Sequence, residues 1–402
     1  MKKIFILILS TFLLVACGNE ASQQSNEKTE MTDKEIETKN YYTFDEDLSM
    51  IASILGEHEI IALGEALHSS LDVSNLKTEL IKELVETHGF NKLYIESSKA
   101  EIAYFNSNDD KELIPDDILP IELLGESFLS LFDIENLTVV GIDYGPYVTP
   151  TLTGNYILDL ITEEIGKLDK EQANDLKSFE MQLMRWKIGQ SDDGPLTVKD
   201  NIYEDIMNHS KYDSLDESTK KFIETRNEEL NDYYTKTSMA TDTRNAYEMR
   251  DAYMAKNIKE DMKNDDKSIV LTHNDHAMAD IGSYESEDEV MRSFFTPPYK
   301  TITNHLRDDG YDVYVVGLFV NEGKYYPASR GQQEFILEHK DDETTLEGFL
   351  GKEVDQSIFI DYKISDFIPE TVTGAYDHGV VKYRADMKKN QDGIIYIPTI
   401  EE

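Results

Sequence analysis

Carboxylate and imidazole side chains follow directly after several apolar segments of this chain. The residues concerned are Glu65 and His68, Glu96, Asp143, and the pair His273 and His276. An imidazole beside carboxylates has a pKa close to neutrality and suits proton abstraction from water at pH 7. These residue types therefore indicate acid–base chemistry of the kind that hydrolysis requires.

Two other kinds of chemistry must be weighed against this interpretation. No G-x-S-x-G motif for a serine nucleophile occurs, and Cys17 is the chain's single cysteine. The pairs Glu65-x-x-His68 and His273-x-x-His276 could supply N and O ligands to zinc, but neither is an H-E-x-x-H motif. We therefore expect no cofactor and no metal, and keep a metal-dependent hydrolase that uses these residues as the alternative.

Short, apolar, β-branched segments alternate with helical patterns, which predicts an α/β fold with a mostly parallel sheet flanked by helices. The expected strands are Ile60–Gly64, Lys92–Glu96, Leu137–Asp143, Ser268–Thr272 and Asp312–Val320, with weaker candidates at Ser357–Asp361 and Gly393–Ile397. The carboxyl ends of parallel strands line one crevice, where ligands bind. The four acidic and histidine-containing segments end the first four strands, so we expect them to meet there.

The interval 151–265, between the third and fourth strands, has helical periodicity, high charge and few β-type segments. We expect a large helical insertion there. The helix that follows the first strand should end at His88, because Gly89 is a favourable C-terminal cap.

The first residues predict export. Lys2 and Lys3 precede an apolar run, Ile4–Ala16, that is too short for a stable membrane span. The run ends in Leu-Val-Ala-Cys-Gly, which resembles the lipobox of bacterial lipoproteins. The resemblance implies a signal peptide at 1–16 and a lipid on Cys17 that holds the chain to the cell membrane, facing the extracytoplasmic side. An ordinary cleaved signal peptide with a chance cysteine is the alternative.

Residues 17–40 are rich in Ser, Gln, Asn, Glu, Thr and Lys, which predicts a flexible tether before a domain at 41–402. The net charge of −41 argues against nucleic acid, because binding to phosphates needs Lys and Arg patches. It also disfavours docking on anionic lipid. We therefore expect two partners, a small-molecule substrate and the membrane reached through the lipid on Cys17.

Three sequence blocks resemble the erythromycin esterase family. GEALH at Gly64–His68, followed by a helix and LYIES, is similar to the family's first histidine block. Arg250 and Asp251 fit its RD-x-x-MA-x-N helix, and LTHNDHAM at Leu271–Met278 fits its second histidine block. The segments VVGLFVNEGKY, IFIDYK and DGIIYIP fit the family's C-terminal strands, so the resemblance covers nearly the whole mature chain in the right order.

The family resemblance implies hydrolysis of an ester or lactone. His68 would be the general base for water, oriented or tuned by Glu65 and Glu96. The residues that would bind the substrate or polarise its carbonyl are His273, His276 and Arg250. Asp143 is grouped with these substrate-binding residues, although shaping the turn at Asp143-Tyr144-Gly145 is its other interpretation.

The sequence also departs from the family. Ser69 replaces the usual glycine after the first histidine, and Leu71-Asp72-Val73 replaces basic and aromatic residues. A second function class is therefore a surface lipoprotein that binds a ligand without hydrolysing it. The remaining histidines are interpreted as structural or surface residues: His58, His88, His209, His305, His339 and His378.

Overall fold

The computed structural model describes residues 40–67, 70–107, 127–144, 156–187, 202–234, 243–289, 292, 295–325, 334–339 and 341–401. His68, Ser69 and the segment with Cys17 lie outside these ranges, so the signal peptide, the tether and the general base stay predictions. Among the described residues, no helix has the length and apolar character that crossing a membrane requires.

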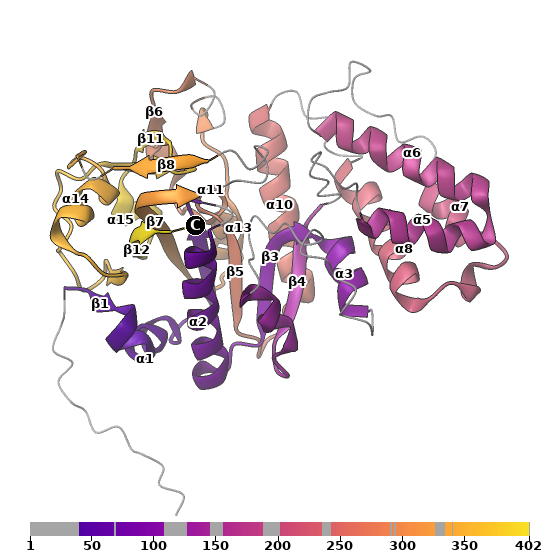
Figure 1. Cartoon of the computed structure of the whole chain (residues 1–402), viewed down its shortest axis with the longest axis horizontal. Coiled ribbons are helices and arrows are strands. Elements are labelled where there is room, and N and C mark those ends of the chain that lie inside the picture. Colours follow the sequence, from indigo (N-terminus) through magenta and orange to yellow (C-terminus); the bar gives the residue numbers. More distant parts are fainter. Residues whose placement is uncertain are drawn as a thin grey trace, which may run out of the picture. The chain divides into compact units, whose positions relative to one another are not determined.

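The core of the fold is a mixed, mostly parallel sheet, and the predicted α/β class is confirmed (Figure 1). Six neighbouring strands run parallel, in the order β12 (Gly393–Ile400), β7 (Val313–Tyr325), β2 (Ile60–Glu65), β5 (Ser268–His273), β3 (Lys92–Ser98) and β4 (Thr138–Asp143). Antiparallel additions are β9 (Ile358–Asp361) beside β12, β1 (Tyr42–Thr43) beside β9, and β8 (Phe335–Glu338) beside β7.

Alternate residues of the central strands enter two different cores. Ile61 and Leu63 of β2 pack with helices α1 (Phe44–Leu55) and α2 (Leu71–His88). Ile60 and Ala62 pack with α10 (Thr243–Asp261) and α13 (Ile302–Asp308) on the other face. Burial on both faces explains why these strands are apolar along their whole length.

Helix α2 ends at His88, as the sequence predicts, and the structure shows how it begins. Ser70 is the N-cap and accepts a hydrogen bond from the Val73 backbone N–H at 3.4 Å. Gly89 adopts a left-handed conformation with φ of 73°, and its N–H bonds the Leu84 carbonyl. This confirms Gly89 as the C-terminal cap, a position where a side chain would be strained.

Between β4 and β5, the described residues form helices. These are α5 (Tyr156–Leu168), α6 (Lys170–Lys187), α7 (Ile202–Met207), α8 (Glu217–Glu229) and α10. Helices α5 to α8 share a hydrophobic cluster that includes Ile161, Leu176 and Ile223, and Tyr253 of α10 also joins it. Helix α10 differs, because Met254, Ala255 and Ile258 pack on the central sheet.

A second, three-stranded sheet was not expected from the sequence. It consists of β10 (Gly374–Asp377), β11 (Val381–Arg384) and β6 (Glu285–Ser286), all antiparallel. Its side chains pack with α14 (Leu346–Glu353) and with α15 (Met387–Asn390), through Ala375, Tyr383, Leu350 and Met387. The turn between β10 and β11 carries His378, which becomes important at the functional site.

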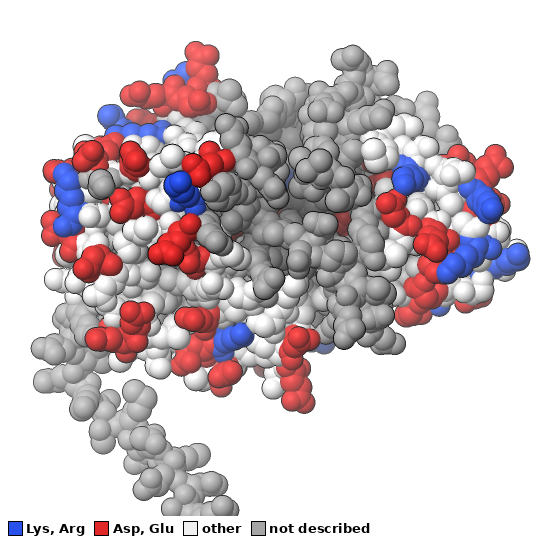
Figure 2. Space-filling model, viewed as in Figure 1, with Lys and Arg blue, Asp and Glu red and all other residues white. Residues whose placement is uncertain are grey.

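Acidic side chains are spread over the described surface in Figure 2, and basic side chains are fewer. This distribution matches the composition, which has 80 Asp and Glu residues but 39 Lys and Arg residues. On the face shown, the described residues present no broad basic patch.

Candidate active site

The carboxyl ends of β2, β5, β3 and β4 bring the predicted acidic and histidine residues to one edge of the sheet. β5 lies between β2 and β3, so Glu65 is the register neighbour of His273. Glu96 lies in β3, and Asp143 is the last residue of β4. Arg250 comes from α10, and His276 from the short helix α11 (Asn274–Ala277) that follows β5.

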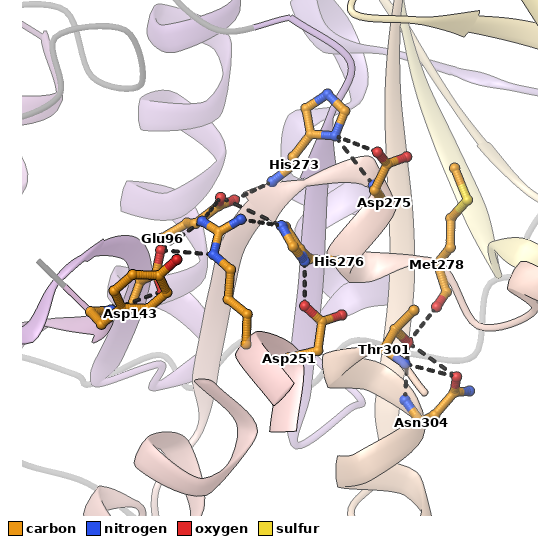
Figure 3. A network of polar contacts seen from close by, with 11 residues as sticks. Glu96, Asp143, Asp251, His273, Asp275, His276, Met278, Thr301 and Asn304 are labelled. Atoms are coloured by element: carbon orange, nitrogen blue, oxygen red, sulfur yellow. Dashed lines mark hydrogen bonds and ion pairs between the residues drawn. The ribbon is translucent and has the colours of Figure 1, made fainter. Parts of the chain in front are cut away.

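Glu96 of β3 connects its own strand to β5 and to α10. Its Oε2 accepts a hydrogen bond from the backbone N–H of His273 at 2.9 Å, and its Oε1 accepts one from Nη2 of Arg250 at 2.6 Å. The same Oε1 lies 3.6 Å from Nε2 of His276 (Figure 3). One buried carboxylate therefore fixes the end of β5, the arginine and the second histidine relative to one another.

Arg250 uses its guanidinium to join three acceptors. Asp143 Oδ2 receives hydrogen bonds from Nε at 3.1 Å and from Nη2 at 2.6 Å. Nη1 lies 2.9 Å from Nε2 of His276. Asp143 is fully buried, and Arg250 is the cation paired with it. Asp143 also accepts the Tyr144 N–H at 2.8 Å, which fits its predicted part in shaping the turn.

His276 lies between Arg250 and Asp251, and its Nδ1 is 2.5 Å from Oδ1 of Asp251. A guanidinium can only donate, so a hydrogen bond between Arg250 and Nε2 forms only with the neutral ring, whose proton is then on Nδ1. Burial lowers the pKa of His276, but Asp251 and Glu96 outweigh burial and Arg250, and raise it to about 9. The ring is therefore mainly protonated at pH 7, and its Nε2–H then faces Oε1 of Glu96 at 3.6 Å in place of the contact with Arg250.

His273 belongs to a different set of contacts from His276. Its Nδ1 lies 3.5 Å from Asp275 Oδ2 and its Nε2 lies 3.4 Å from Asp377 Oδ1. Figure 3 shows the ring of His273 turned toward Asp275, while the ring of His276 is turned toward Asp251. The two histidines of the His-x-x-His pair therefore do not converge on one shared ligand.

Glu65 forms a buried ion pair with Lys77 of α2, and both side chains are 1% exposed. Glu65 is followed by Ala66 and Leu67, and the described chain resumes at Ser70; Leu67 and Ser70 are also buried. A cation from α2 thus holds the carboxylate three residues before His68. Lys77 was missed because a lysine on an amphipathic helix is ordinarily solvated.

Other site residues were also missed. Asp251 was part of a recognised motif but had no assigned role, and Asp275 lay unassigned inside the second histidine block. His378 was interpreted as structural or surface, yet its ring centroid lies 4.3 Å from that of His273. Neither Asp377 nor His378 follows a strongly apolar strand, so the signal that identified the other residues did not apply to them.

Comparisons with known proteins show which family this chain belongs to. The family model for erythromycin esterase matches residues 133–400. The chain belongs to the erythromycin esterase family, and it is accordingly a hydrolase of the esterase class. No curated protein sequence matches it.

Three solved structures share the fold at low sequence identity. A histidine-to-asparagine mutant of erythromycin esterase EreC, in its open conformation, is 16% identical with a TM-score of 0.56, over 89% of this chain and 94% of that one. A protein from Bacillus cereus is 18% identical with a TM-score of 0.56, over 90% and 94%. A succinoglycan biosynthesis protein is 14% identical with a TM-score of 0.58, over 90% and 93%.

Proposed function

We propose that this chain hydrolyses an ester or lactone of a small molecule by direct attack of water, with His68 as the general base. Glu65 and Glu96 orient or tune that base, and His273, His276 and Arg250 bind the substrate or polarise its carbonyl. The observation that carries the proposal is the placement of Glu96. This one carboxylate contacts His273 and Arg250 and faces His276, so residues of all three family blocks meet at Glu96 of β3.

The chemical step needs one base and one positive region. His68 takes a proton from water as the water oxygen bonds to the carbonyl carbon, which gives a tetrahedral oxyanion. Arg250 and a protonated His276 supply positive charge beside Glu96, where they can stabilise that oxyanion. The carbon–oxygen bond to the leaving alkoxide then breaks, and the imidazolium of His68 returns the proton to it. No bond to the protein forms at any stage.

The contacts of Arg250 refine its part in this scheme. Its Nε, Nη1 and Nη2 are directed at Asp143, His276 and Glu96. Arg250 therefore acts on the substrate carbonyl through the positive charge of its fixed guanidinium. It also positions His276. Asp143 acts on the substrate only indirectly, because its buried carboxylate holds the guanidinium of Arg250 in place.

We also propose that the enzyme works outside the cytoplasm, tethered to the membrane through a lipid on Cys17. The apolar run before Cys17 and the polar segment after it support this location. Mass spectrometry of Cys17 in the membrane fraction tests the tether. A mature protein that is released into the medium with an unmodified Cys17 contradicts it.

The catalytic proposal is tested with His68→Asn, assayed on aryl esters, short-chain esters and macrolide lactones. General-base catalysis contributes typically ~10²–10⁴-fold, so kcat should fall by that factor while the thermal unfolding midpoint stays unchanged. His88→Asn, at the far end of α2, is the matched control and should keep full activity. Undiminished turnover by His68→Asn removes this residue from the mechanism.

The absence of a covalent intermediate is tested separately. Direct water attack predicts no burst of alcohol release when the enzyme is mixed with an activated aryl ester. A burst that is stoichiometric with enzyme contradicts direct attack. Wild-type protein that binds a ligand tightly but hydrolyses no ester or lactone would identify the chain as a binding protein.

A further inference from the structure

The turn between β10 and β11 places two potential metal ligands against His273. Asp377 Oδ1 lies 3.4 Å from Nε2 of His273, and Asp377 Oδ2 lies 3.0 Å from Nδ1 of His378. His273 and Asp377 are buried, whereas the side chain of His378 is 45% exposed. The three residues come from two different sheets, so the tertiary fold has assembled this group.

The spacing of these atoms suits a divalent transition metal. One ligand atom from each residue lies within 4.8 Å of the others. Zinc bonds of about 2.0–2.1 Å in tetrahedral geometry put neighbouring ligand atoms about 3.3 Å apart. The separation of 3.4 Å between His273 and Asp377 is long for a hydrogen bond and matches that value.

The surroundings of His273 supply the support that a metal ligand needs. Its Nδ1 accepts the backbone N–H of Asp275 at 3.4 Å and lies 3.5 Å from the carboxylate of the same residue, the kind of acid to which a ligating histidine donates its second ring N–H. Its backbone N–H is held by Glu96. Metal binding at Nε2 would shift the ring proton to Nδ1, where a hydrogen bond donated to the Asp275 carboxylate would replace the one accepted from the Asp275 N–H.

The backbone of the turn is held in an unfavourable conformation that presents His378. His378 has φ of +49°, uncommon for a residue with a side chain, and Gly379 follows with φ of +64°. The Tyr325 hydroxyl donates to the His378 carbonyl at 3.0 Å. A Cβ at Gly379 would lie 2.5 Å from Leu67, so the turn packs against the residue that precedes His68.

We propose that His273, Asp377 and His378 bind one divalent transition metal ion of the zinc class. Two imidazoles and one carboxylate leave a fourth position for water, reached from the exposed side of His378. The site carries a charge of −1 before binding and +1 afterwards, and Asp275 and Glu96 lie close enough to offset the gain. This ligand set differs from the Glu65, His68, His273 and His276 alternative, and it does not depend on ester hydrolysis.

The test is a titration of the metal-free, full-length chain with Co²⁺ and Zn²⁺, in detergent and without a histidine tag. Cys17→Ser is included in every protein so that the single thiol cannot bind metal. The expected result is one Co²⁺ per chain with the visible absorption bands of four-coordinate cobalt, and displacement by Zn²⁺. If the protein with Cys17→Ser as its single change gives no such bands, the proposal is overturned and the group is a His–Asp–His hydrogen-bond arrangement.

Three variants locate the bound ion. His378→Asn should keep the turn, because asparagine tolerates a positive φ, and Asp377→Asn keeps the side-chain shape. Each should weaken Co²⁺ binding at least ~100-fold, and Asp275→Asn should weaken it by ~10–100-fold. His209→Asn, in the helical region, is the matched control and should bind as the wild type does. Stoichiometric binding that survives both His378→Asn and Asp377→Asn overturns the proposal.

Discussion

Asp251 Oδ1 lies 2.5 Å from Nδ1 of His276, and this pairing orients the imidazole whose Nε2 faces Arg250. Asp251 is fully buried on α10, and His276 is 3% exposed in α11, the short helix after β5. Burial raises the pKa of the Asp251 carboxyl, although the nearby His276 and Arg250 act in the opposite direction. The pair therefore joins the helix to the sheet at the candidate site.

Asp251→Asn should lower the pKa of His276 from about 9, because burial and Arg250 then act against less negative charge. The raised pKa stabilises the wild type fully below about pH 6.5, and this contribution is lost as pH rises through about 9. The stability difference between wild type and Asp251→Asn should accordingly shrink across that window. Ring NMR titration, assigned with His276→Asn, and denaturant unfolding at several pH values measure both effects. A pH-independent difference contradicts the assignment.

Arg250→Met should raise the pKa of His276 further, because the guanidinium is one of the groups that lower it. The same change leaves the buried Asp143 without its cation, at a cost of about 3–5 kcal/mol in the free energy of unfolding. Arg250→Lys keeps a charge without the planar donor arrangement and should fall between Met and the wild type. NMR titration measures the pKa of His276, and denaturant unfolding measures the free energy of unfolding. An unchanged His276 pKa in Arg250→Met would show that Arg250 does not act on this ring, and a fall would contradict the direction assigned to it.

Lys77→Met should destabilise the fold by about 3–5 kcal/mol, since it leaves the buried carboxylate of Glu65 without its cation. Adding Glu65→Gln removes that charge, so the double variant should recover most of the loss. Lys82→Met on the same helix is the control and should change stability by less than ~0.5 kcal/mol. Additive effects of Lys77→Met and Glu65→Gln in chemical denaturation would contradict the coupling.

Gly64→Ala should destabilise the site end of β2. The added Cβ would lie 2.2 Å from Oδ1 of Asn274, whose side chain bonds both the N–H and the carbonyl of Leu318. Displacing Asn274 should cost about 1–3 kcal/mol. Gly166→Ala is the matched control, because its Cβ would meet open space with one contact at 3.8 Å, and it should stabilise α5 by up to ~1 kcal/mol. Equal effects of the two variants in thermal unfolding would contradict this explanation.

The sequence by itself determined the strands and the residues at their ends. β2, β3, β4, β5 and β7 match the predicted segments to within one residue at their starts, because apolar β-branched runs are typical of strands buried on both faces of a mostly parallel sheet. The polar residues after these runs could be identified from the sequence as well, because a buried apolar strand does not need charged residues at its end in order to fold. The family blocks around Glu65, Arg250 and His273 were also readable without coordinates.

Only the tertiary structure decided which strand lies beside which, and which acid meets which cation. The insertion of β5 between β2 and β3 puts His273 beside Glu65 and within reach of Glu96. The pairing of Lys77 with Glu65 and the approach of His378 to His273 depend on packing between distant segments. Local patterns determine which residues are buried or exposed, but the partner of a buried charge is set by the three-dimensional arrangement of strands and helices.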